Sequence, residues 1–150
     1  MSGIEPTPLF VDTGPVYARF DADDSLHDRS IEFFERIRTG DLLYRPVYTS
    51  RYVLAETTRL LVQRVSHEAA RTALSAVRNS NLFTVLAVDE DHFEAACEQF
   101  AEYDDQTITL VDHLSSTLAG AHDAAHVFTF DSDDFRTLGH TTVPDKTDDG

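Results

Sequence analysis

Two short apolar runs in this chain each end in an aspartate. Leu9-Phe10-Val11 precedes Asp12, and the run from Val127 to Phe130 precedes Asp131. Open α/β sheets build active sites from buried strands that deliver a carboxylate at their C-terminal ends. If these strands lie parallel in the centre of one sheet, Asp12 and Asp131 emerge side by side at its carboxyl edge. Carboxylates forced together there repel unless they share protons or a divalent cation.

A third acid, Glu56, stands at an awkward position in a predicted helix. It follows Val53 by three residues and precedes Leu60 by four, which puts it at the margin of the buried arc. A carboxylate at that margin needs a partner, or its pKa rises until it is neutral. The alternative is an ion pair at the rim with Arg59 or Arg64.

The fourth acid, Asp112, lies in the first turn of another predicted helix. Acids favour first turns because of the helix dipole, so a purely structural role is the alternative here. Its neighbours Val111 and Leu114 are apolar, which indicates a helix end that points inward. Carboxylate sets of this kind suit Mg²⁺ or Mn²⁺ rather than zinc. The chemistry that such an ion supports is hydrolysis of a phosphodiester.

The elements that must position these acids alternate between strand and helix, which predicts an α/β fold with a mainly parallel sheet. The predicted strands are 9–12, 46–49, 83–88, 126–130 and 140–143. The predicted helices are 16–20, a helix capped by Ser25 and stopped by Gly40, 50–65, 66–78, one that begins at Asp89, 109–122 and a turn over 132–138. We expect one domain over residues 1–150, with its core at about 9–143 and a polar tail at 144–150.

Composition excludes several classes of protein. No apolar run is long enough to span a membrane, and the N-terminus lacks the basic start and apolar stretch of a secretion signal. Cys97 is the one cysteine, which excludes an internal disulfide and a zinc site built from several thiolates. We therefore expect a cytoplasmic protein. No histidine spacing of the HxxxH or HExxH kind occurs, which disfavours a histidine-bound metal.

The charge balance is extreme: 27 acids against 12 bases, and Lys146 is the one lysine. Such an acidic surface keeps proteins soluble in molar salt, where the Debye length falls to about 3 Å and self-repulsion is screened. A halophilic source is predicted. Most acids are then solvated surface, and only their positions carry information about function.

Four segments together resemble the PIN-domain ribonucleases, and most closely the VapC-like toxins of toxin–antitoxin pairs. They are Val11 to Ala18, Thr49 to Glu56, Thr109 to Ser115 and Val127 to Phe135. Each segment alone is weak, but their order and separation fit the family over about residues 9–143. The resemblance implies a PIN-like three-layer α/β/α fold, with a parallel sheet of about five strands flanked by helices.

The resemblance also implies function and partners. A site made of Asp12, Glu56, Asp112 and Asp131 would hold Mg²⁺ or Mn²⁺, with Thr13 beside Asp12 positioning a ligand or water. Proteins of this family cleave RNA, are silenced by a small antitoxin protein and usually form homodimers. The expected function is thus a metal-dependent endoribonuclease acting as a toxin.

One departure from the family pattern concerns the last acid. The family commonly places an aspartate three residues before the closing phenylalanine, whereas Asp131 is four before Phe135. Asp133 is therefore a second candidate or an auxiliary acid, although Asp131 directly follows the strand. Asp24 and His27 also resemble an Asp-x-x-His element of some relatives, with a solvated loop as the alternative.

RNA binding by so acidic a chain needs local cations. Arg19, Arg45, Arg51 and Arg136 lie next to the segments that carry the acids. RNA binding normally depends on contacts between arginine or lysine side chains and phosphates.

Two other functions remain open. An aspartyl-phosphate phosphohydrolase would use the strand that ends in Asp12, but it needs a second acid where Gly14 stands and a lysine near the site. A catalytically silent PIN-like interaction module would not need all four acids.

Overall fold

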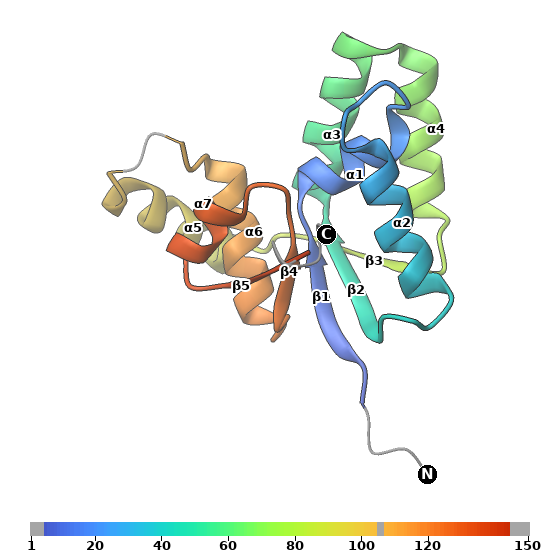
Figure 1. The fold of residues 1–150 in the computed structure, drawn as a ribbon. Helices are drawn as coiled ribbons and strands as arrows, with labels where there is room; N and C mark the ends of the chain where they lie inside the picture. The colour runs from blue at the N-terminus through green and yellow to red at the C-terminus, as the bar shows by residue number, and fades with distance from the viewer. Residues whose placement is uncertain (1–4, 105–106, 145–150) are drawn as a thin grey trace.

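The computed structural model describes residues 5–104 and 107–144, and these form a sheet with helices on both sides (Figure 1). The strands are β1 (Thr7–Val11), β2 (Tyr44–Ser50), β3 (Phe83–Leu86), β4 (His126–Phe128) and β5 (Thr141–Val143). The helices are α1 (Thr13–Phe20), α2 (His27–Arg38), α3 (Arg51–Arg64), α4 (His67–Arg78), α5 (Glu90–Glu102), α6 (Leu110–Ala121) and α7 (Ser132–Thr137).

All neighbouring strands are parallel, in the order β3-β2-β1-β4-β5. The predicted parallel sheet of about five strands is confirmed. β1 lies between β2 and β4, and Val11 pairs with Phe128. The backbone N–H of Asp12 then donates to the carbonyl oxygen of Phe128 at 3.0 Å. The ends of these two strands are therefore adjacent, as the sequence pattern requires.

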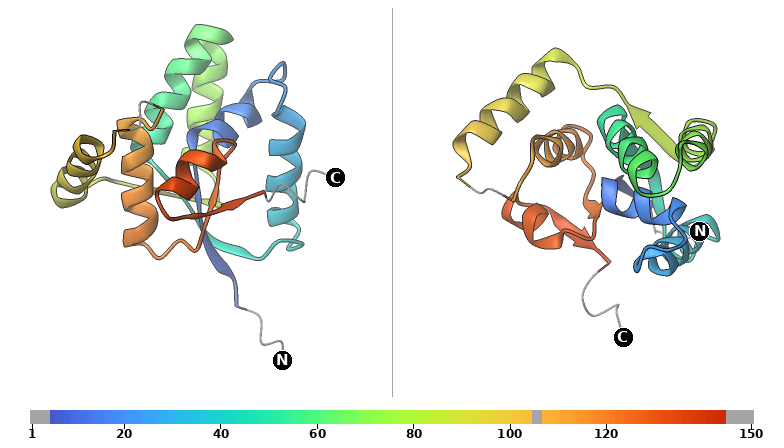
Figure 2. Two further views of the ribbon diagram at one scale, coloured as in Figure 1. Left: turned by 60° about the vertical axis from the view of Figure 1, so that its left-hand side comes forward. Right: turned by 90° about the horizontal axis from the view of Figure 1, so that it is seen from above.

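Helices cover both faces of the sheet (Figure 2). On one face, Phe33 and Phe34 of α2 pack against Phe128, with ring centroids 4.0 and 5.3 Å apart. On the other face, the ring of His122, just after α6, lies 5.1 Å from that of Tyr48 in β2. The C-terminal halves of β1 and β4 are thus buried on both sides, which is why Leu9 to Val11 and Val127 to Phe128 are apolar runs.

Several predicted helix starts are confirmed. Ser50, Ser66 and Asp89 each accept a hydrogen bond from the backbone N–H three residues further on, at the starts of α3, α4 and α5. Gly40 follows α2 with φ at 84°, a conformation that glycine adopts without strain. The predicted cap at Ser25 is wrong. Asp24 Oδ1 instead accepts the N–H of Leu26 at 2.8 Å, and this turn delays α2 to His27.

Several predicted boundaries also differ by a few residues. β3 stops at Leu86 rather than Val88 because Leu86 pairs with Ser50, the last residue of β2. β4 stops at Phe128 because Thr129 Oγ1 accepts the N–H of Asp131 at 2.9 Å, which turns the chain. α1 begins at Thr13 rather than Val16, since Pro15 falls in a first turn, where its missing N–H has no intrahelical partner to lose.

The α3–α4 hairpin extends beyond the carboxyl end of the sheet (Figure 1). Tyr17 of α1 packs with Leu61, Ala70 and Ala73 of this hairpin in a small core of its own. This core fixes α3 against α1 and so fixes the direction in which α3 presents its remaining faces. Of the helices in the described part of the chain, none is both long and apolar enough to cross a membrane.

Candidate metal-binding nuclease site

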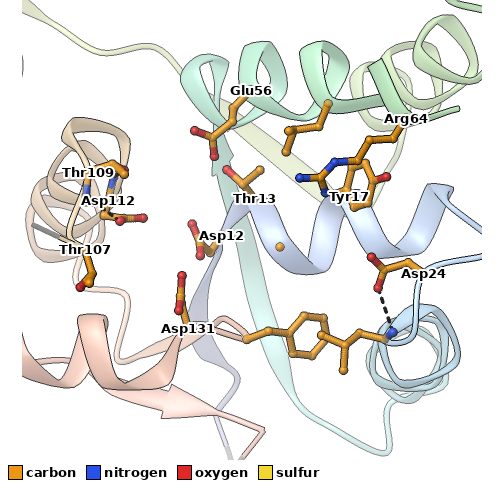
Figure 3. A pocket seen from close by; sticks show the side chains of 14 residues that line it. Asp12, Thr13, Tyr17, Asp24, Glu56, Arg64, Thr107, Thr109, Asp112 and Asp131 are labelled. Carbon is orange, nitrogen blue, oxygen red and sulfur yellow. Dashed lines mark hydrogen bonds between the residues drawn. The ribbon is translucent and has the colours of Figure 1, made fainter. Parts of the chain in front are cut away.

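A pocket of about 390 Å³ opens at the carboxyl edge of the sheet, where β1 and β4 end. All four acids selected from the sequence line it: Asp12, Glu56, Asp112 and Asp131. They come from the end of β1, from α3, from α6 and from the turn before α7. Figure 3 shows their carboxylates pointing into one common space. The negative charges of Asp112 and Glu56 both raise the pKa of Asp12, which is consistent with carboxylates that lie near one another.

Asp12 is the most deeply buried of the four. It stands at the N-cap position of α1, yet its side chain makes no capping hydrogen bond there. Only 5% of Asp12 is exposed, and burial followed by repulsion from Asp112 raises its pKa to about 7. A carboxylate that loses its proton near neutral pH can exchange that proton for a cation.

Thr129 contacts both strand-end aspartates through hydrogen bonds. It was not among the candidate residues selected from the sequence. Its hydroxyl donates to Asp12 Oδ2 at 3.0 Å and accepts the backbone N–H of Asp131 at 2.9 Å. Thr129 is itself 2% exposed. One available signal was a hydroxyl side chain two residues before a strand-end aspartate, which favours such a turn.

Glu56 is half-buried on α3, on the same stripe as Leu60 and Arg64, and all three line the pocket. Among residues 5–104 and 107–144, Glu56 forms no ion pair with Arg59 or Arg64, so the rim ion pair considered above does not form. Arg59 instead donates to Gln63 on the same helix, at 3.4 Å. The carboxylate of Glu56 faces the other acids.

Asp112 combines the two roles that the sequence left open. With Thr109 it forms a capping box: Asp112 Oδ2 accepts the N–H of Thr109 at 2.9 Å, and Thr109 Oγ1 accepts the N–H of Asp112 at 3.2 Å. The same side chain lines the pocket, where burial and then nearby Asp131 raise its pKa. Asp112 Oδ2 thus caps the start of α6, while the same carboxylate still lines the pocket with its negative charge.

The two auxiliary residues fall in different places. Thr13 lines the pocket, and its buried hydroxyl has no hydrogen-bond partner among the described residues. Such an orphaned oxygen is unfavourable unless a ligand or water satisfies it. Asp133 is exposed on α7 and does not line the pocket, although its charge contributes to the raised pKa of Asp131. Asp131 therefore remains our candidate for the fourth acid.

The Asp-x-x-His element has a structural explanation. Asp24 lines the pocket but accepts the N–H of Leu26 (Figure 3), and His27 Nδ1 lies 2.7 Å from the carbonyl oxygen of Ala18. His113, beside Asp112, is 1% exposed and packs against the rings of Phe100 and Tyr103. Neither histidine lines the pocket.

The cations near the site differ from those expected. None of Arg19, Arg45, Arg51 and Arg136 lines the pocket. Of the described residues, Arg64 is the one arginine or lysine that does. An aspartyl-phosphate mechanism needs a lysine near the site. The one lysine of the chain, Lys146, lies outside the described residues.

The pocket suits a hard divalent cation in donor type, charge and polarity. Every acidic ligand candidate offers oxygen, and the orphaned hydroxyl of Thr13 faces the same cavity. In the described part of the chain, however, no three acidic, cysteine or histidine side chains lie close enough together to hold a metal ion as they stand. Mutual repulsion of carboxylates favours such spacing, and coordination requires their side chains to turn inward.

This fold and pocket define a class: parallel α/β proteins with an acidic pocket at the carboxyl edge of the sheet. Residues 9–140 match the PIN domain, and the chain belongs to that family of metal-dependent nucleases. It is 31% identical over 137 residues to the 23S rRNA-specific endonuclease VapC20 of Mycobacterium tuberculosis, a match that covers 90% of this chain and 97% of that protein. Nucleases of this family generally use divalent metal ions.

Solved structures agree. The crystal structure of VapC20, a toxin that cleaves the sarcin–ricin loop, has a TM-score of 0.73 to this chain at 30% identity, covering 86% of this chain and 94% of that one. VapBC2 of Rickettsia felis bound to promoter DNA scores 0.66 at 14% identity, covering 90% and 96%. FitAcB of Neisseria gonorrhoeae scores 0.64 at 18% identity, covering 89% and 95%. The last two likenesses concern the fold alone.

Proposed function

We propose that this protein is an Mg²⁺- or Mn²⁺-dependent endoribonuclease whose metal is held by Asp12, Glu56, Asp112 and Asp131. The observation that carries the proposal is the convergence of these four acids, from segments up to 119 positions apart, on one pocket. A second acid near a first raises its pKa and disfavours ionisation, and a divalent cation removes that penalty. An interaction module without catalysis would not need this arrangement.

The residues of the chain have distinct parts in the proposed reaction. A divalent cation bound here supplies charge neutralisation of the phosphate and a more acidic water. Asp12 releases its proton when a cation is bound, because its pKa of about 7 keeps it partly protonated at neutral pH. Thr129 donates to Asp12 Oδ2 and so fixes the direction of the carboxylate that would hold the cation. Thr13 offers its free hydroxyl to a water or phosphate oxygen.

The relatives suggest a substrate and partners. VapC20 acts on 23S rRNA, so we propose structured ribosomal RNA as the substrate. The structural neighbours VapBC2 and FitAcB belong to toxin–antitoxin complexes, so we propose a small antitoxin as the inhibitor. A homodimer, a cytoplasmic location and a halophilic source complete the proposal. The net charge of −15 supports a high-salt setting, where screening lets an acidic protein approach RNA.

The test is cleavage of purified 23S rRNA and of transfer RNA in molar KCl, with Mg²⁺, Mn²⁺ or EDTA. We expect cleavage with either ion, none with EDTA, and none from Asp12→Asn or Asp112→Asn proteins whose circular dichroism matches the wild type. Glu68→Gln, a change of an exposed acid on α4 outside the pocket, is the matched control and should cleave normally. Retained cleavage in both aspartate variants refutes the assignment.

A further inference from the structure

Of the described residues, Arg64 is the one cation that lines the acidic pocket proposed as the active site. Every other charged residue that lines the pocket, within the described part of the chain, is an aspartate or glutamate. A substrate that carries phosphates must enter this negative cavity against repulsion, even after a cation has neutralised part of it. The Arg64 guanidinium, which lines the pocket, is the group there that can form charge-assisted hydrogen bonds with an incoming phosphate.

The position of Arg64 relative to the acids is set by helix geometry. Glu56, Leu60 and Arg64 follow one another at intervals of four residues, so they form one stripe along α3. The rise of an α-helix separates the ends of this stripe by about 12 Å. Figure 3 shows the guanidinium of Arg64 entering the pocket from the far end of that stripe. It therefore lies beside the catalytic acids rather than among them.

Tyr17 holds the guanidinium in place. The Arg64 Cζ lies 5.3 Å from the centroid of the Tyr17 ring, and Tyr17 is itself 4% exposed. This cation–π contact orients the guanidinium, and part of its edge interacts with the Tyr17 hydroxyl. A guanidinium has five N–H donors, so others remain for a phosphate. Arg64 is exposed, which leaves these donors accessible from the pocket.

No acid in the described residues neutralises Arg64. Within residues 5–104 and 107–144, it forms no ion pair with any carboxylate, although Asp24 and Glu56 line the same pocket. Arg36 and Arg38, in contrast, are paired with Asp41 and Glu35.

We propose that Arg64 is the phosphate anchor of the RNA-binding surface. It binds a backbone phosphate that flanks the phosphate cleaved between the acids, and so sets the register of the RNA strand in the pocket. The proposal rests on the ribonuclease function proposed above. In this proposal Arg64 is a substrate-positioning residue. On the same face of α3, Glu56 would help to hold the cation and Arg64 would bind the RNA backbone.

The test measures binding apart from catalysis. Fluorescence anisotropy of a labelled single-stranded RNA, with EDTA present and over a series of KCl concentrations, compares the wild type with Arg64→Gln. We expect Arg64→Gln to bind about tenfold more weakly at the lowest salt. The slope of log K against log salt should flatten by about 0.7, which corresponds to one lost phosphate contact.

Two further variants make the result specific. Arg59→Gln removes the same charge from the same helix outside the pocket, and should keep the wild-type slope. Arg64→Lys keeps the charge but not the bidentate fork, so it should keep the slope and lose affinity about threefold. It also serves if Arg64→Gln fails to fold. Affinities and slopes equal to wild type for Arg64→Lys and for folded Arg64→Gln overturn the proposal, as does an equal loss in Arg59→Gln.

Cleavage kinetics separate the two proposals. With Mn²⁺, Arg64→Gln should raise KM about tenfold and change kcat by less than threefold, because the residue positions RNA without touching the reacting atoms. A protein that binds RNA through Arg64 and cleaves none refutes the nuclease function and leaves the anchor intact. A protein that cleaves RNA with wild-type KM in Arg64→Gln refutes the anchor alone.

Discussion

The hydroxyl of Thr129 donates a 3.0 Å hydrogen bond to Oδ2 of Asp12, and so joins residues 117 positions apart in the chain. The same hydroxyl oxygen accepts the N–H of Asp131. One buried side chain thereby sets both the direction of the most buried acid and the turn that delivers the acid beside it. Residues of this kind behind a metal ligand orient it and are costly to remove.

Thr129→Val is expected to lower metal-dependent RNA cleavage by about 10- to 100-fold. Valine has the same shape but cannot donate to Asp12, whose pKa then rises further because this hydrogen bond lowers it. Thr129→Ser keeps the hydroxyl and should stay within a few-fold of wild type. Cleavage rates at several Mn²⁺ concentrations measure both. Equal rates in Val and Ser variants would contradict the role given to the hydroxyl.

The raised pKa of Asp12 predicts how stability depends on pH in EDTA. The folded protein binds this proton up to about pH 7, whereas the unfolded chain releases it near 3.8. The free energy of unfolding should therefore fall as pH rises from about 4 to about 7, and level off above that. The Asp12 contribution is at most about 4 kcal/mol.

Urea unfolding of wild type and Asp12→Asn at pH 5.5 and 8 measures this contribution. The variant should be the more stable protein at pH 8, and the difference should shrink at pH 5.5. Acids outside the pocket contribute equally to both proteins, so they cancel in that comparison. Addition of Mn²⁺ at pH 8 should stabilise the wild type and leave the variant nearly unchanged. A difference between the proteins that does not vary with pH would show that Asp12 titrates normally.

The double role of Asp112 can be separated by two substitutions. Asp112→Asn keeps an oxygen that can accept the N–H of Thr109, so it should fold normally and lose cleavage. Thr109→Ala removes the other half of the capping box and should lower the free energy of unfolding by about 1 kcal/mol while cleavage persists. Thermal unfolding and RNA cleavage give the two readouts. Loss of cleavage in Thr109→Ala with its stability intact would contradict this division.

The choice between Asp131 and Asp133 is also testable. Asp131 lines the pocket and Asp133 does not, so Asp131→Asn should abolish cleavage while Asp133→Asn should reduce it by less than threefold. Binding of Mn²⁺, measured by calorimetry, should weaken in the first variant alone. The opposite ranking would transfer the fourth position to Asp133.

Local patterns in the sequence were enough to predict a mainly parallel sheet and to select four acids that line one pocket of the structure. Strands buried on both faces leave apolar runs, and helix caps leave Ser50, Ser66 and Asp89 at fixed offsets. These signals arise from the residue and its near neighbours, so they can be seen without coordinates. One boundary failed because a partner elsewhere in the chain ended the element, as Ser50 does for Leu86, and others failed at short turns such as that between Thr129 and Asp131.

The sequence by itself determined a parallel α/β protein with acids at the ends of its strands, because periodicity and composition record burial directly. Only the tertiary structure decided which other side chains join those acids. Local sequence offered only a turn signal for Thr129, and for Arg64 only a possible ion pair with Glu56. Both residues matter because β4 lies beside β1 and because packing on Tyr17 fixes how α3 is rotated. Distances between remote segments depend on the packing of the whole core, which no local stretch of sequence encodes.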